Sequence, residues 1–298
     1  MQTLRKELKR QLPEWTSYMP SHLIDYALKE ASQAFKSAIT NMKRHNQKFF
    51  LKYKSRKKSI TETIAIEKCF INMHKNTIFS GCMRRQNVNS KLRSNIAFST
   101  VKNFKDGYLT YNRVLKTWCL RISYAKQNEK ADLSKYSKVC ALDPGERDFI
   151  TGYGINHTFS IGQNTRKRLH EEGNRCDHFQ SQMNKKVGSK LKYNHRKRQG
   201  LRKKLHRQIK KIKDLKNELH WKTINFLCKN YRTIILPEFG TSKMVCNLNK
   251  KISRNLMKLS HYKFRIRLIA KAKEYGCKVI ICTEEYTSKC CTKCGNLK

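Results

Sequence analysis

The chain has few acidic residues for its length. Its 298 residues contain 21 Asp and Glu against 66 Lys and Arg, which gives a formal net charge of +45 at pH 7. Self-repulsion among so many like charges destabilises a compact fold, so a basic surface that serves solubility alone is the weaker interpretation. Each phosphate that a cation neutralises releases counterions, and the charge therefore predicts a polyanionic partner.

The sequence also lacks the marks of secreted and membrane proteins. Its opening residues, Met1 to Lys6, contain no apolar core of the kind that a signal peptide needs, and no apolar run approaches membrane-spanning length. Nine of the twelve cysteines lie outside the C-terminal group and show no Cys-x-x-Cys spacing. We therefore expect a protein of the reducing cell interior, cytoplasmic or nuclear, with no membrane partner.

The apolar spacing divides the chain into two parts. Residues 21–45 show a helical period, and Ser21, which follows Pro20, is expected to cap that helix. Short β-like runs with basic residues between them follow from about residue 50 to 124. The last run predicts a half-buried strand from its alternating apolar residues Trp118, Leu120 and Ile122. The polar segment 125–138 is the candidate domain boundary.

Beyond this boundary the pattern predicts an α/β domain. Three short strands, one long amphipathic helix, and then a strand, a helix and a strand are expected in that order, at 139–142, 149–153, 158–161, 201–227, 233–236, 253–275 and 278–282.

An acidic residue follows each of three apolar strands: Asp143, Glu238 and the pair Glu284 and Glu285. Acids at neighbouring strand ends of an α/β sheet meet at one edge, where carboxylate oxygens can hold Mg²⁺ or Mn²⁺. Two such ions activate a water and stabilise the leaving oxygen of a phosphodiester. Strand ends are polar in most proteins, so the pattern alone fits an ordinary solvated edge equally well.

Residues 185–216 hold fifteen Lys and Arg and a single acid, Asp214. Pairing at i,i+4 cannot account for charges of one sign, whose repulsion costs stability unless phosphates bind. A solvated helix face is the alternative. The residues expected to contact nucleic acid are Lys197, Arg198, Arg202, Lys203, Arg207 and Lys210. The aromatic and basic stretch 49–56 suits base stacking or burial in a strand.

The C-terminal residues contain half of a zinc knuckle. Cys291 and Cys294 precede Gly295, which lets the chain turn so that two thiolates take neighbouring corners of a Zn²⁺ tetrahedron. A structural site needs four ligands. Cys290 is expected to point away from its neighbour Cys291, and nothing favours Cys282 as a further ligand.

Three motifs resemble those of the TnpB family of transposon-encoded proteins, and most closely its eukaryotic and giant-virus branch, Fanzor. They are ALDPGERDF at 141–149, LPEFGTSKM at 236–244 and EYTSK at 285–289, followed by the Cys-x-x-Cys-Gly of the knuckle. The resemblance covers residues 139–295. The N-terminal half resembles the family only in its general pattern of helical and β-rich segments.

The resemblance implies an RNA-guided, metal-dependent DNA endonuclease with guide RNA and target DNA as partners. An RNase H-like RuvC domain of α/β class, containing the long basic helix, would occupy residues 138–286. An α+β recognition region with helical and β-barrel-like parts would precede it over 1–137, and a partial zinc ribbon would follow over 287–298.

The same resemblance assigns catalytic roles to the acids. Asp143 would be the first catalytic residue and Glu238 the second, although alignment on Met244 places Pro237 where that acid usually stands. The third acid would be one of two neighbours, Glu284 or Glu285, of which Glu284 is preferred.

The sequence departs from the family pattern near its end. In the family a second Cys-x-x-Cys and a final catalytic Asp follow, whereas this sequence stops at Lys298. We therefore expect it to bind nucleic acid and to cut target DNA weakly or not at all. Two alternatives stay open: a nuclease-dead relative that binds RNA and DNA, and a DNA transposase, for which Tyr286 shows no sign of activation. The oligomeric state is left open.

Overall fold

The computed structural model describes residues 7, 11–46, 59–85, 89–93, 103–125, 138–187, 190–191, 193–246, 248–283, 290–291 and 294–296. The chain divides into two compact units, residues 1–126 and 127–298. This division falls inside the polar segment 125–138, where the sequence predicts a boundary. Among the helices described in these ranges, none is both long and apolar enough to cross a membrane.

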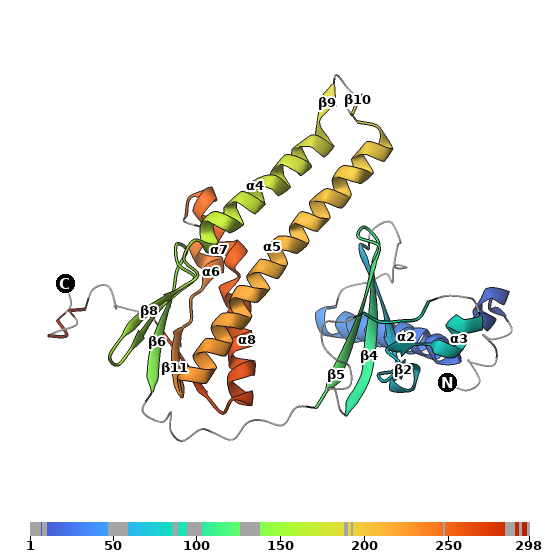
Figure 1. The fold of residues 1–298 in the computed structure, drawn as a ribbon, viewed down its shortest axis with the longest axis horizontal. Coiled ribbons are helices and arrows are strands. Elements are labelled where there is room, and N and C mark those ends of the chain that lie inside the picture. The colour runs from blue at the N-terminus through green and yellow to red at the C-terminus, as the bar shows by residue number, and fades with distance from the viewer. Residues whose placement is uncertain are drawn as a thin grey trace. The chain divides into compact units, whose positions relative to one another are not determined.

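The N-terminal unit combines one long helix with a small antiparallel sheet (Figure 1). Its elements are η1 (Glu14–Tyr18), α2 (Ser21–His45), β1 (Thr61–Ile66), η2 (Lys68–Phe70), β2 (Ile71–Asn72), β3 (Thr77–Ile78), α3 (Ser80–Arg85), β4 (Phe104–Asn112) and β5 (Thr117–Tyr124). Strand β4 pairs with β1 on one side and β5 on the other. The unit has a core of its own, made of Ile66, Ile71, Met73, Ile78, Phe79 and Leu109.

The helix predicted over residues 21–45 is confirmed, but two details of this unit were predicted wrongly. Pro20 occupies the N-cap position of α2 and no side chain caps that end, so Ser21 is the first helical residue. The predicted half-buried strand is found as β5, with Leu120 and Ile122 packed against the core, but Trp118 is 57% exposed and its ring lies 4.5 Å from that of Tyr111.

The expected barrel-like part is not found in the described portion of this unit. There, the larger sheet is open, with β1 and β5 at its edges. The aromatic and basic stretch 49–56 lies outside the described residues.

The C-terminal unit contains a mixed five-stranded sheet with helices. Its elements are β6 (Val139–Pro144), β7 (Ile150–Gly154), β8 (Thr158–Ile161), α4 (Thr165–Asn184), β9 (Lys186–Val187), β10 (Lys190–Leu191), α5 (His195–Asn230), β11 (Thr233–Pro237), α6 (Thr241–Met244), α7 (Lys250–Leu259), α8 (His261–Glu274) and β12 (Lys278–Cys282). The strand order is β12-β11-β6-β7-β8. Strands β6, β7 and β8 are antiparallel, whereas β11 runs parallel to both β6 and β12. The predicted α/β pattern is confirmed.

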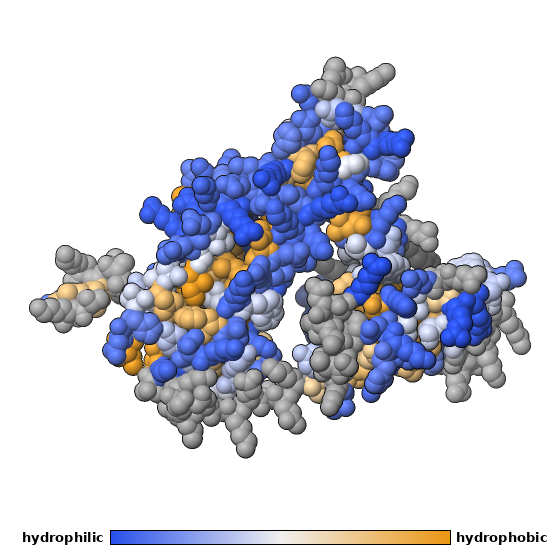
Figure 2. All heavy atoms as spheres, viewed as in Figure 1, coloured by the Kyte–Doolittle hydropathy of each residue, from blue (hydrophilic) through white to orange (hydrophobic). Residues whose placement is uncertain are grey.

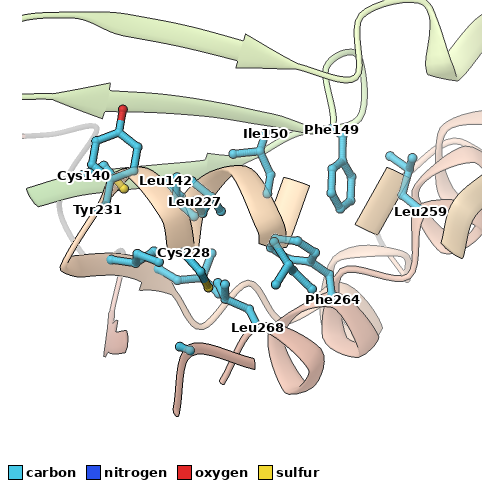
Figure 3. Close-up of a cluster of buried hydrophobic side chains, with 14 of the residues drawn as sticks. Cys140, Leu142, Phe149, Ile150, Leu227, Cys228, Tyr231, Leu259, Phe264 and Leu268 are labelled. Atoms are coloured by element: carbon cyan, nitrogen blue, oxygen red, sulfur yellow. The ribbon is translucent and has the colours of Figure 1, made fainter. Parts of the chain in front are cut away.

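The core of this unit lies between the sheet and helices α5 and α8 (Figure 3). Helix α5 buries Ile224, Leu227 and Cys228 on one face, and α8 buries Phe264 and Leu268 four residues apart. These spacings place the side chains on one side of each helix. Full burial of a Leu, Ile or Phe side chain contributes about 1.5–3 kcal/mol relative to exposure, so these contacts fix both helices on the sheet.

Two helices differ from the sequence expectations. The single helix expected over 253–275 is two helices, because Ser260 adopts the left-handed conformation (φ 54°, ψ 54°) between α7 and α8. The apolar spacing continues across this break and does not reveal it. Helix α4 was not predicted, because only Leu169, Glu172 and Gly173 are buried along it and no apolar stripe marks it.

Candidate functional site

Two of the predicted acids lie at the same edge of the sheet. Strand β6 carries Asp143 near its end and pairs in parallel with β11, which Glu238 follows directly. Both residues are exposed. Strand β12 runs parallel to β11 and ends in register with it, Cys282 opposite Pro237. Its end therefore lies at the same edge, while Glu284 and Glu285 themselves lie outside the described residues.

The two acids approach this edge from different sides. The buried positions of β6 are Cys140, Leu142 and Pro144, so Asp143 points to the opposite face of the sheet. Glu238 lies past the end of β11 and lines a small cavity with Pro144 and His261, beside α8. The fold thus brings the two segments together at the strand ends, with Asp143 on the exposed face of β6 and Glu238 past the end of β11.

The turn after Asp143 is held from α4 and α7. The amide of Gly145 donates to the carbonyl of Phe149 at 3.3 Å and closes the turn. The carboxylate of Glu146 accepts from Arg166 Nε at 2.9 Å, on α4, and from Asn255 Nδ2 at 3.0 Å, on α7. These contacts fix the loop that carries the first predicted acid.

The start of α8 contacts both acid-bearing segments. His261 Nε2 donates to the carbonyl of Gly145 at 3.1 Å, and its ring meets the ring of Phe239 edge-on at 5.0 Å. Arg265 Nη1 donates to the carbonyl of Glu238 at 3.1 Å. Burial lowers the pKa of His261 to about 4, against an opposing effect of the Gly145 carbonyl, so the ring is neutral at pH 7.

The sequence motifs do not single out Glu146, Asn255 or His261. Glu146 lies three residues after Asp143 inside the first motif, and that second acid is a usable signal. No local pattern marks Asn255 or His261, because only the packing of α7 and α8 brings them to the turn.

The predicted nucleic-acid contacts lie on a helical hairpin formed by α4 and α5. Its surface is largely hydrophilic (Figure 2). Buried Glu172 on α4 accepts hydrogen bonds from Gln208 and from Lys211 Nζ at 2.6 Å, both on α5. The hydrogen bond from Lys211 is the largest cause that holds the pKa of Glu172 below its usual value. One carboxylate therefore ties the two helices together.

The six predicted cations differ in exposure. Lys197, Arg202, Arg207 and Lys210 are exposed, whereas Arg198 and Lys203 are half-buried. The ammonium of Lys197 lies 4.3 Å from the centre of the Tyr193 ring.

The C-terminal cysteines lie in a tight turn. Gly295 has a φ of 74°, as expected for a glycine that reverses the chain, and its amide donates to the carbonyl of Cys291 at 2.8 Å. Cys291 and Cys294 are exposed, while the thiol of half-buried Cys290 lies 3.1 Å from the carbonyl of Gly295.

The donor chemistry fits the predicted metals only in part. Two exposed carboxylates suit Mg²⁺ or Mn²⁺, and two exposed thiols on one turn suit Zn²⁺. Within the described ranges, no group of three or more His, Cys, Asp or Glu side chains is placed to hold a metal ion.

Comparisons with known proteins find similarity to a family model and to a solved structure. Residues 261–298 match the family model described as Cas12f1-like, TNB domain. A cryo-EM structure of a Cas12f1–sgRNA–target DNA complex is 16% identical, with a TM-score of 0.47, over 89% of this chain and 63% of that chain.

Viral relatives carry the family name. A TnpB-like protein of Acanthamoeba polyphaga mimivirus is 28% identical over 93% of this chain and 52% of its own length. A Paramecium bursaria Chlorella virus 1 protein with the provisional name of a transposase is 27% identical over 95% of this chain and 63% of its own length. The chain thus spans about half to two-thirds of the length of these relatives. These matches support the assignment to the TnpB family that its motifs predicted.

Proposed function

We propose that the chain is an RNA-guided, metal-dependent DNA endonuclease whose acidic site lies at the carboxyl ends of β6 and β11. The observation that carries the proposal is the parallel pairing of two strands that each lead to an exposed acid at one edge, Asp143 and Glu238. Three antiparallel strands followed by two parallel ones is also the arrangement expected of the RNase H-like domain that the motifs imply.

In this proposal the chain itself positions the acids. The ion pair of Glu146 with Arg166, its hydrogen bond from Asn255 and the hydrogen bond from His261 hold the turn after Asp143. Arg265 holds the backbone of Glu238. Mg²⁺ or Mn²⁺ bound by these carboxylates would activate a water and stabilise the leaving oxygen of the phosphodiester. Glu284, shortly after the end of β12, is proposed to complete the acidic set.

The net charge and the basic face of the α4–α5 hairpin support guide RNA and target DNA as partners. Phosphate contacts by Arg202, Arg207 and Lys210 would position the nucleic acid without reading its sequence. The exposed thiols of Cys291 and Cys294 are proposed to bind Zn²⁺, with the remaining two ligands supplied from elsewhere.

A second candidate is a relative that binds nucleic acid without cutting it. Asp143 points away from the buried face of β6, whereas Glu238 lies past the end of β11 beside α8, and this separation favours this candidate. Two carboxylates that do not converge hold two metal ions less well than two that do.

One cleavage experiment separates these candidates. The full chain is mixed with RNA transcribed from the sequence that flanks its coding region and with matching plasmid DNA, in Mg²⁺ or in Mn²⁺. Cutting that is abolished in Asp143→Asn and kept in Asp214→Asn, an exposed acid on α5, supports the endonuclease. Asp143→Asn should also weaken Mn²⁺ binding at least about tenfold in a calorimetric titration, because one hard ligand is removed.

The remaining outcomes are equally informative. RNA binding without cutting by the wild type supports the second candidate. Cutting that survives Asp143→Asn contradicts the proposed site, and the absence of RNA binding contradicts both candidates.

A further inference from the structure

Four cations gather where α5 meets α8, away from the six that the sequence singles out. Lys213 and Lys216 lie on α5, while Lys263 and Arg267 lie one turn apart on α8. Like charges at i,i+3 and i,i+4 repel one another. Burial, followed by the charges of Lys263, Arg267 and Lys213, lowers the pKa of Lys216, so the charges of the other three residues reach Lys216 from both helices.

Neutral groups hold two of these four cations, Lys216 and Arg267, in place. Lys216 Nζ donates to Ser260 Oγ at 2.9 Å. Arg267 donates to His220 Nδ1 at 3.1 Å and to Asn217 Oδ1 at 2.8 Å. In the part of the chain that the structure describes, no carboxylate forms an ion pair with any of the four. Lys216 and Arg267 are thus held by neutral acceptors that leave their charge uncompensated.

An aromatic ring lies beside this group. The guanidinium of Arg267 lies 5.1 Å from the centre of the Trp221 ring, and Trp221 is 46% exposed. An indole with one side against a cation and much of its surface open is a stacking platform for a base.

The group is also linked to the acidic edge through a short series of hydrogen bonds. Ser260, which accepts from Lys216, directly precedes His261, and His261 donates to Gly145 in the turn after Asp143. A strand bound at the cations would therefore have its backbone held next to the helix that fixes this turn.

We propose that Lys213, Lys216, Lys263 and Arg267 form a phosphate-binding site for single-stranded nucleic acid, with Trp221 stacking against a base. This inference rests on the proposed nucleic-acid function and adds a second contact surface to it. The ligand chemistry is a phosphodiester backbone with an unpaired base, which RNA and DNA share.

The test neutralises the two exposed lysines of the site in the full chain. Lys213→Gln with Lys263→Gln is compared with Lys229→Gln with Lys273→Gln, exposed lysines on the same two helices. The control removes the same charge from α5 and α8 at other positions. Fluorescence anisotropy follows the binding of labelled single-stranded RNA, DNA of the same sequence, and the duplex, over a range of KCl concentrations, and thermal unfolding checks that each variant folds.

We expect the site variant to reduce the slope of log affinity against log salt by about 1.4, or about 0.7 for each single-strand phosphate that is no longer neutralised. The control variant should leave that slope unchanged. The RNA and DNA titrations show which strand the site prefers, and preferred binding of the duplex would overturn the proposal.

The fluorescence of Trp221 tests whether its ring stacks against a base. In a chain with Trp15→Phe and Trp118→Phe, Trp221 is the single tryptophan left, so its fluorescence reports on this site. Quenching by saturating single-stranded RNA or DNA is expected. If the wild type binds but the two lysine pairs behave alike, or if Trp221 is not quenched, this inference is wrong while the proposed function stands. If the wild type binds neither RNA nor DNA, the proposed function fails as well.

Discussion

At the scale of single residues, the ring of Phe149 joins the acid-bearing turn to two helices. It stacks on His220 of α5 at 5.2 Å and on His261 of α8 at 5.0 Å between ring centres. His220 Nδ1 accepts from Arg267, so Nε2 carries the proton and donates to the carbonyl of Leu259 at 2.8 Å. These contacts require neutral His220, because a second proton would face the guanidinium of Arg267.

The protein should therefore lose stability in mild acid through His220. Burial lowers the pKa of His220 to about 4, and the nearby charges of Arg267, Lys216 and His261 act in the same direction. Because the folded pKa lies below the usual 6.5, stability is present above pH 6.5 and is lost as the pH falls from 6.5 towards 4. The loss should reach about 3 kcal/mol by pH 4.

Denaturant unfolding at several pH values measures this loss. In His220→Gln the pH dependence between 6.5 and 4 should be shallower, whereas His206→Gln, a half-buried histidine on the same helix, should keep most of it. An unchanged profile in His220→Gln would rule out His220 as a source of the acid lability.

Two glycines offer a matched test of backbone conformation. Gly162 has a φ of 87°, and a Cβ there would lie 2.6 Å from the Cβ of Phe149, whereas a Cβ on Gly200 within α5 would meet nothing within 4 Å. Gly162→Ala should cost about 2 kcal/mol or more of unfolding free energy, and Gly200→Ala should add up to about 1 kcal/mol. Urea unfolding measures both, and stabilisation by Gly162→Ala would contradict the described turn.

At the scale of elements, the α4–α5 hairpin depends on polar contacts along part of its length. Helix α4 buries few residues, and Glu172 is one of them. Its carboxylate accepts hydrogen bonds from Lys211 and Gln208 on α5. On its own helix, Arg175 Nη1 lies 3.5 Å from Glu172 Oε2. When a buried carboxylate loses a strong hydrogen-bond donor, the groups that paired with each other are left without a partner, which costs stability.

Glu172→Gln should therefore destabilise the hairpin by about 1–3 kcal/mol. The amide keeps the size of the side chain but removes the charge that binds Lys211. The matched control is Glu218→Gln, which breaks the exposed pair of Glu218 with Lys222 and should have no measurable effect. Hydrogen exchange along residues 165–184 measures local opening, and equal protection in both variants would contradict this role of Glu172.

At the scale of the whole molecule, 66 basic residues outnumber 21 acidic ones. Binding to a polyanion should therefore depend steeply on salt concentration. This term acts at long range and needs no specific contact. Individual phosphate contacts, by contrast, require cations that are exposed and held in position. Of the predicted residues, Arg202 and Arg207 are exposed and Lys203 is half-buried on α5.

Charge reversal of these three residues should weaken RNA binding and flatten its salt dependence. Arg202→Glu, Lys203→Glu and Arg207→Glu together should reduce the slope by about 0.7–0.9 for each phosphate that these residues neutralise in the wild type. The comparison variant reverses Lys222, Lys229 and Lys273, which changes the net charge equally. A salt slope that is the same in the triple variant and the wild type would show that this face of α5 is not a contact surface.

The sequence by itself determined most of the local elements and the resemblance to a family. Alternating or helical apolar spacing is a property of neighbouring residues, so it predicted α2, the strands from β6 to β12 that form the main sheet, and the long helix α5. The motifs around Asp143 and Glu238 likewise consist of contiguous residues. The parallel direction of β6 and β11, by contrast, is seen only in the structure, where α4 and α5 connect β8 to β11.

Only the tertiary structure decided how distant residues meet. Asn255 reaches Glu146 across 109 residues of chain, and Lys216 reaches Ser260 across 44. The left-handed Ser260 separates α7 from α8 and aims His261 at the turn after Asp143, a result of packing that no periodicity contains. The gathering of cations from α5 and α8 depends on the same packing. Spacing along one helix or strand sets only the side on which a residue lies and not which distant residues it contacts there.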